Sequence, residues 1–321
     1  MRALIMLIPF VLLASPANGQ LFSKLQNNVN QVNQTDDPPS SSMSKAYEIS
    51  NAIVKDRLHA EDDDNKRLIE DISSTDLVVI DGTYDHIHLV LFYLKLPFVR
   101  LNHQQLLTAE LNPHQTVFVN CASSFPVEGA RKLATFVAHG GQLITTDWAL
   151  EKVLEPAFPG VVEYNKKPTA DEVVRIEVID REDPVIKGFL DEETAPVWWL
   201  ESSSYPIRIL DKDKVKVLIK SKELKEKYDE EAVLIKFEYG KGVVYHMISH
   251  FYLQRTETKD AAQRAAASSY FKAKNISQEQ ATMLQEEAAD LNYGEVQSAN
   301  TSAEFIMRAV IVQKKRNENN K

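Results

Sequence analysis

Short apolar runs alternate with amphipathic helical segments in the first half of the chain. The runs are of the kind that a parallel sheet buries on both faces, and they cover residues 77–80, 98–101, 117–119 and 142–145. Between the last two runs, Leu133, Phe136 and Val137 recur at helical spacing until Gly140 and Gly141 end the helix. Strand and helix therefore alternate three times, which predicts a parallel sheet with helices on both faces.

The pattern changes after residue 160. Five further strands are predicted, several of them joined by short turns: residues 173–179, 197–200, 215–219, 232–237 and 243–248. We expect them to add antiparallel strands to the sheet or to form an excursion before the chain returns to it. The predicted fold class is α/β, a mostly parallel doubly wound sheet with extra antiparallel strands and C-terminal helices.

Helical patterns occupy both ends of the chain. Helices with an apolar side are predicted before the first strand, at residues 46–58 and 66–72, and after it, at residues 89–94. From residue 258 onward the chain is rich in Ala, Glu and Gln. Ser277 with Gln280, and Thr301 with Glu304, have the spacing of capping boxes.

The N-terminus has the features of a signal peptide. A basic residue precedes an apolar stretch at residues 3–14 that is short for a bilayer span, and small residues follow at 17–19. We expect a secreted or periplasmic protein without stable membrane insertion after cleavage; a retained anchor is the alternative. The predicted organisation is a signal peptide at 1–19, a disordered linker at 20–44, an α/β domain at 45–256, a helical insertion or lid at 257–300, a closing helix at 301–313 and a flexible tail at 314–321.

The charge and the cysteine content of the chain limit the classes of partner and of fold that it can have. The 321 residues carry a net charge of -9, which argues against nucleic acid as a partner. A single cysteine, Cys121, excludes an internal disulfide, so the hydrophobic core must stabilise the fold. Asn33, Asn275 and Asn300 each begin an Asn-x-Ser/Thr triplet, which matters only if the host glycosylates exported proteins.

Polar residues follow the predicted strands. Because successive parallel strands end at one edge of a sheet, one crevice should collect these side chains: Asp81, Asn120, Cys121, Ser123, Thr146, Asp147, Trp148 and His250. We interpret them as a polar pocket in which Asp147 and His250 bind or polarise a ligand. Alternatively, Asp147 caps a helix at 148–153, which we slightly favour for this residue alone, and His250 bonds a neighbouring carbonyl.

The segment from Trp198 to Tyr205 has the most unusual composition of the chain. On a strand, Trp198 and Trp199 point to opposite faces, so we expect one indole in the core and the other available to the crevice or surface. An exposed indole beside Tyr205 and Glu201 could stack on a sugar ring. Burial of both indoles is the commoner outcome.

A metal site is chemically conceivable but not predicted. Asp81, His86, His88 and His250 offer suitable atoms. However, His86 and His88 are two residues apart at the start of a helix and should diverge around it. We therefore predict neither a metal nor a cofactor.

Three passages carry a resemblance to a known family: the strand at 78–81, the helix-Gly-Gly-strand passage at 131–147, and residues 239–245 leading to His250. They resemble the class I glutamine amidotransferase-like superfamily, and more closely its non-amidotransferase relatives of the trehalose-utilisation, gliding and intraflagellar-transport type. The resemblance spans most of 77–251. It implies a flavodoxin-like sheet.

The same resemblance implies that the glutaminase centre is missing. Family members carry a Cys nucleophile in a Gly-x-Cys-x-Gly elbow, and these positions fall on Thr145, Asp147 and Ala149. His250 matches the family histidine, but Tyr252 stands where its acid is expected. A carboxylate cannot replace a thiolate in this chemistry. Cys121 belongs to the preceding strand, and we predict a small buried residue there rather than a nucleophile.

The sequence thus predicts an exported, catalytically degenerate amidotransferase-like domain that acts as a ligand-binding or scaffolding module. Its partner would be an unknown small molecule or carbohydrate, or a protein. One alternative is an enzyme of another class, a carbohydrate hydrolase or isomerase that uses Asp147 and His250 as acid and base. Another is an interaction protein that binds through residues 254–300, which could equally form a lid over the strand ends.

Overall fold

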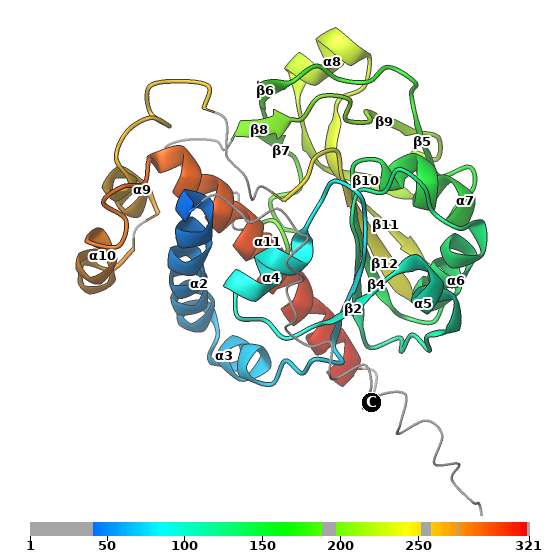
Figure 1. The fold of residues 1–321 in the computed structure, drawn as a ribbon, viewed down its shortest axis with the longest axis horizontal. Coiled ribbons are helices and arrows are strands. Elements are labelled where there is room, and N and C mark those ends of the chain that lie inside the picture. Colours follow the sequence, from blue (N-terminus) through cyan, green and yellow to red (C-terminus); the bar gives the residue numbers. More distant parts are fainter. Residues whose placement is uncertain (1–40, 188–196, 252–257, 275, 320–321) are drawn as a thin grey trace, which may run out of the picture.

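The computed structural model describes residues 41–187, 197–251, 258–274 and 276–319, which contain a ten-stranded mixed sheet (Figure 1). Five parallel strands lie in the order β2-β1-β3-β4-β12, and they are β1 (Leu77–Ile80), β2 (Val99–Leu101), β3 (Thr116–Val119), β4 (Gln142–Thr146) and β12 (Gly242–Met247). Counted along the chain this order is 2-1-3-4-5, the arrangement of flavodoxin-like sheets. The predicted α/β fold is confirmed.

Antiparallel strands extend the sheet beyond β12. β11 (Ala232–Tyr239), β10 (Val215–Lys220) and β7 (Glu177–Val178) follow in that order. β9 (Ile207–Ile209) pairs with β11, and β5 (Val162–Tyr164) pairs with β9. The predicted strand at 173–179 is in fact two strands, because β6 (Glu172–Arg175) leaves the main sheet to pair with β8 (Val197–Leu200).

Helices cover both faces of the sheet (Figure 1). On one side lie α5 (His103–Thr108), α6 (Val127–Ala138), the π-helical turn η1 (Leu150–Leu154) and α7 (Glu155–Ala157). On the other lie α2 (Ser41–Glu61), α3 (Asp63–Glu70), α4 (Ile87–Tyr93) and α11 (Tyr293–Asn319). α8 (Lys222–Tyr228) connects β10 to β11. None of the helices in the described part of the chain has the length and apolarity that a bilayer span requires.

The turn between β11 and β12 packs tightly on the end of α6. A Cβ atom at Gly242 would lie 2.2 Å from the carbonyl oxygen of Val137. Gly240 has a φ of +60°, which favours glycine, and a Cβ there would lie 2.5 Å from the carbonyl oxygen of Ala138. These glycines let the hairpin approach the helix and set β12 beside β4.

The C-terminal helices differ from the sequence-based expectation. α11 runs unbroken through residues 300 and 301 to Asn319, so the predicted capping box at Thr301 and Glu304 is wrong. The predicted one at Ser277 is partly confirmed: its hydroxyl caps α10 (Gln278–Gln285) by accepting from the Gln280 amide. Asn300 is fully buried in α11, so glycosylation there is incompatible with this fold.

The same layer holds the shorter C-terminal helices. α9 (Ala267–Ala273) packs against α11, where the rings of Tyr270 and Tyr293 meet edge to face. Gln280 of α10 reaches the carbonyl oxygen of Ala52 in α2. The helix predicted at 46–58 begins earlier, at Ser41, while the predicted signal peptide and most of the predicted linker lie outside the described residues.

Candidate functional site

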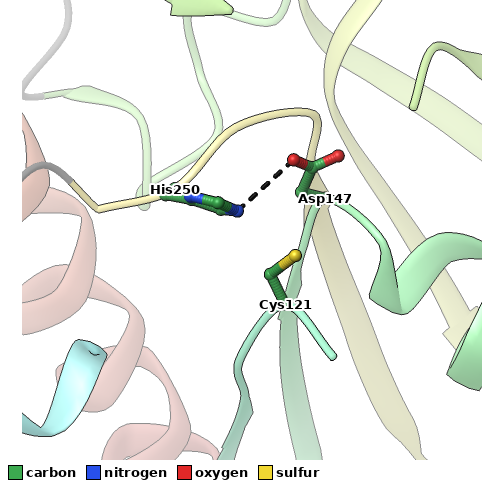
Figure 2. Close-up of side chains that lie close together, drawn as sticks. All are labelled: Cys121, Asp147 and His250. Carbon is green, nitrogen blue, oxygen red and sulfur yellow. Dashed lines mark ion pairs between the residues drawn. The ribbon is translucent and has the colours of Figure 1, made fainter. Parts of the chain in front are cut away.

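The ends of three neighbouring parallel strands bring together three polar side chains. β4 lies between β3 and β12, and Cys121, Asp147 and His250 follow these strands. Figure 2 shows the thiol and the imidazole directed toward the carboxylate. One ligating atom from each residue lies within 4.8 Å of those of the other two. The strand-end cluster predicted from the sequence thus has a buried centre.

Asp147 turns its side chain into this centre. Its Oδ1 accepts a hydrogen bond from the amide of Tyr205 at 2.8 Å, and its Oδ2 accepts one from Ser204 Oγ at 3.0 Å. The helical cap is wrong: the residue that precedes η1 is Ala149, and no side chain caps that turn. Asp147 has a φ of 42°, so the left-handed turn forms although neither elbow glycine is present. Burial raises the pKa of Asp147, against the opposing influence of His250.

His250 lies between two carboxylates. Its Nε2 is 3.3 Å from Asp147 Oδ2, and its Nδ1 is 2.9 Å from Glu201 Oε2. These partners replace the backbone carbonyl that we considered from the sequence. Burial by itself would lower the pKa of His250, but Asp147, Cys121 and Glu201 together raise it well above its usual value.

Cys121 is buried, as predicted, and it packs against the imidazole rather than in an apolar core. Only 1% of its surface is exposed. Burial raises the pKa of the thiol, and His250 opposes that shift. Its carbonyl oxygen accepts hydrogen bonds from the amides of Thr83 and Tyr84, which ties the loop after β1 to the loop after β3.

Asp85 is a member of the site that sequence reasoning missed. Its Oδ2 accepts a 2.7 Å hydrogen bond from Thr146 Oγ1, and burial raises its pKa. Its Oδ1 and the Oδ1 of Asn120 are buried without a hydrogen-bond partner in the described part of the chain. The missed signal was the polar loop after β1, where Asp85 is separated from the strand end by several residues.

A row of aromatic rings borders Asp147. Trp148 stacks on Tyr205, which stacks on Tyr164 with ring centroids 3.8 Å apart. Tyr84, which is 55% exposed, meets Trp148 edge to face. The indole of Trp148 also donates to the carbonyl oxygen of Ser203 at 2.7 Å. These rings and the partly exposed Glu201 form the outer part of the site.

Trp198 and Trp199 do not join that row. They are 6% and 8% exposed, so both indoles are buried, which is the commoner of the two outcomes considered from the sequence, and neither is available to the crevice or surface. Trp199 Nε1 donates to Asp171 at 2.6 Å. The alternation along β8 does not expose either indole because α11 covers one face and the outer strands and loops cover the other.

Other predicted residues lie at the periphery. Asp81 forms an ion pair with Arg100 at 2.5 Å, and the hydroxyl of Ser123 bonds that of Thr83 at 3.0 Å. The set of Asp81, His86, His88 and His250 is not gathered into a metal-ligating group. Within the described residues, the group that has this geometry is Cys121, Asp147 and His250.

His250 also lines a small cavity between the sheet and α11. Trp198, Met247 and Phe305 are among its walls. Its volume is about 20 Å³, which is enough for about one water molecule. The imidazole therefore has a narrow cavity on the side of α11 and the aromatic row on the side of Asp147.

Comparison with known proteins gives structural similarities only. No protein-family model matches the chain, and no curated protein matches it. A glutamine amidotransferase from Thermotoga maritima is similar over 73% of this chain and 97% of its own, with 10% identity and a TM-score of 0.43. A putative ThuA-like protein from Bacteroides uniformis covers 54% of this chain and 80% of its own, with 11% identity and a TM-score of 0.37.

A β-galactosidase from Bacillus circulans is similar over 59% of this chain, with 12% identity and a TM-score of 0.40. This chain spans 31% of that enzyme's length.

Proposed function

We propose that this chain is an exported ligand-binding protein that lacks glutaminase chemistry and binds a small polar molecule at the strand-end site. The supporting observation is His250 held between Asp147 at 3.3 Å and Glu201 at 2.9 Å. Asp147 occupies the left-handed turn where the amidotransferase resemblance places a nucleophilic thiol. A carboxylate there can accept hydrogen bonds but cannot perform thiolate chemistry.

The outer part of the site favours a hydroxylated ring, such as a carbohydrate, as the ligand. Carboxylates accept hydrogen bonds from hydroxyl groups, and aromatic faces cover apolar ring surfaces. Glu201 keeps 31% of its side chain exposed, and Trp148 and Tyr205 are half-buried. Because the ring of Tyr205 is stacked between Trp148 and Tyr164, we propose that Trp148 and Glu201 contact the ligand, with His250 and Asp147 buried nearby.

A thermal-shift titration tests this proposal. Monosaccharides and small hydroxy acids are added to the wild-type chain in the presence of a metal chelator. A ligand should raise the melting temperature of the wild type and of Asp81→Asn, a carboxylate at another strand end, but not that of Glu201→Gln or Trp148→Ala. A shift that persists in both site variants would contradict the proposal.

One observation favours a second function. The site contains the arrangement of a catalytic triad, with Cys121 as the nucleophile, His250 as the base and Glu201 as the orienting acid. The thiol lies near Nε2 of the imidazole, while Nδ1 contacts Glu201. This arrangement would suit a thiol-dependent hydrolase. Against it stand the burial of the thiol, which raises its pKa, and the presence of Asp147 at the same imidazole nitrogen. Ester turnover that is lost in Cys121→Ser but kept in Asp147→Asn would favour the hydrolase.

A further inference from the structure

We propose that Cys121, Asp147 and His250 bind a zinc ion through Sγ, a carboxylate oxygen and Nε2. The inference deepens the proposed function, on which it rests, by assigning an ion to the floor of the same site. The three ligand atoms come from the ends of three adjacent strands and lie within 4.8 Å of one another.

The distances between the ligand atoms suit an ion with tetrahedral coordination. Zinc bonds of about 2.0 to 2.3 Å place neighbouring ligand atoms roughly 3.4 Å apart. Nε2 of His250 and Oδ2 of Asp147 are already 3.3 Å apart. A small rotation of the Cys121 side chain, which points toward both residues in Figure 2, would complete three corners of the tetrahedron.

His250 Nε2 needs a partner that the protein does not fully provide. Despite its proximity to Asp147, this buried nitrogen makes no hydrogen bond of acceptable geometry with any described residue. The contact with Asp147 is an ion pair that does not meet the geometric criteria of a hydrogen bond. A metal ion between Nε2, the carboxylate and the thiolate would satisfy the nitrogen.

The surrounding hydrogen bonds are those of a metal centre. Ligating histidines commonly give their other ring nitrogen to a carboxylate, and ligating carboxylates are themselves hydrogen-bonded. Here Nδ1 of His250 contacts Glu201 at 2.9 Å. Asp147 accepts from the amide of Tyr205 and from the hydroxyl of Ser204. These contacts fix the orientation of both ligands before an ion binds.

Donor chemistry selects the ion. A thiolate, an imidazole and a carboxylate form a mixed set that suits zinc, whereas magnesium and calcium prefer oxygen ligands. A dication also neutralises the thiolate and the carboxylate in a nearly water-free place. Three protein ligands leave a fourth position open, as in catalytic zinc sites.

Cobalt spectroscopy tests this inference on the wild-type chain. The full chain is stripped with a chelator and titrated with Co²⁺, and the bound metal is then replaced by Zn²⁺. Because Cys121 is the only cysteine, a thiolate-to-cobalt charge-transfer band at one equivalent can arise only from this residue. Zinc should abolish the band, slow alkylation of the thiol and raise the melting temperature.

Variants locate the ion and separate it from the ligand site. Cys121→Ser and His250→Gln should lose the band, Glu201→Gln should weaken metal binding about 10- to 100-fold, and Asp81→Asn should behave as the wild type. Circular dichroism verifies that each variant is folded. Absence of the band in the wild type, or cobalt binding without thiolate character, overturns the zinc site.

The carbohydrate titration is performed in chelator, so its outcome judges the proposed function independently.

Discussion

Nε2 of His250 lies 3.3 Å from Oδ2 of Asp147, at the ends of the neighbouring parallel strands β12 and β4. Both side chains are buried, at 7% and 3% exposure. Two opposite charges in such a place stabilise each other, and removing one leaves the other without compensation. The pair is therefore both part of the candidate site and a structural link between two strands.

A double-mutant cycle measures this link. Asp147→Asn and His250→Gln should each lower the free energy of unfolding by about 3 kcal/mol, because each leaves a buried polar group with an incomplete set of partners. The double variant should lose less than the sum, by about 1 kcal/mol or more. Urea unfolding in chelator provides the values. Losses that add within about 0.5 kcal/mol would show that the two residues do not interact.

Alkylation of Cys121 tests the thiol-hydrolase alternative. The thiol is buried and its pKa is raised by that burial, so the folded protein should react with iodoacetamide at neutral pH at least about tenfold more slowly than the urea-unfolded chain. Mass spectrometry follows the reaction, and the single cysteine makes the readout unambiguous. A folded protein that reacts faster than the unfolded chain would indicate an activated thiolate.

His246 should make the protein sensitive to acid. Burial lowers the pKa of this histidine to about 3, while in the unfolded chain it is about 6.5. Below pH 6.5 the unfolded chain therefore binds a proton that the folded chain does not bind. The free energy of unfolding should fall from this cause by about 1.4 kcal/mol per pH unit as the pH decreases.

Unfolding curves at several pH values check this contribution. Between pH 6.5 and pH 5, the stability advantage of the wild type over His246→Gln should shrink by about 2 kcal/mol. The advantage over His139→Gln, a variant at an exposed histidine, should change little. An advantage over His246→Gln that stays constant with pH would contradict the low pKa.

Glu304 should stabilise the packing of α11 on α2. Its side chain is completely buried, forms an ion pair with Arg57 and lies 3.5 Å from Nε of Arg308. Glu304→Gln leaves Arg308 less well compensated, and the free energy of unfolding should fall by about 3 kcal/mol. Glu318→Gln, at an exposed pair on the same helix, should have a much smaller effect in the same urea titration. Equal effects of the two variants would show that burial does not matter at Glu304.

Local pattern predicted the regular elements because burial on both faces of a parallel sheet requires continuous apolar runs. All four early strands and the helix at α6 were recognisable for this reason. The strands β5 and β9, of three residues each, were not predicted. Thr301 and Glu304 carried a capping pattern, yet α11 continues through them because its burial against α2 and the sheet outweighs a local preference.

The sequence by itself determined the α/β class, the gathering of polar residues at one edge of the sheet, and the absence of a cysteine at position 147. Only the tertiary structure decided which of those residues meet. It placed Glu201 on His250, turned Asp147 away from a helical cap, and set Cys121 beside both. The physical reason is that the strand pattern fixes only which residues follow the strand ends, and therefore which side chains lie at that edge of the sheet. The direction and partners of each side chain depend on loops that pack from distant parts of the chain.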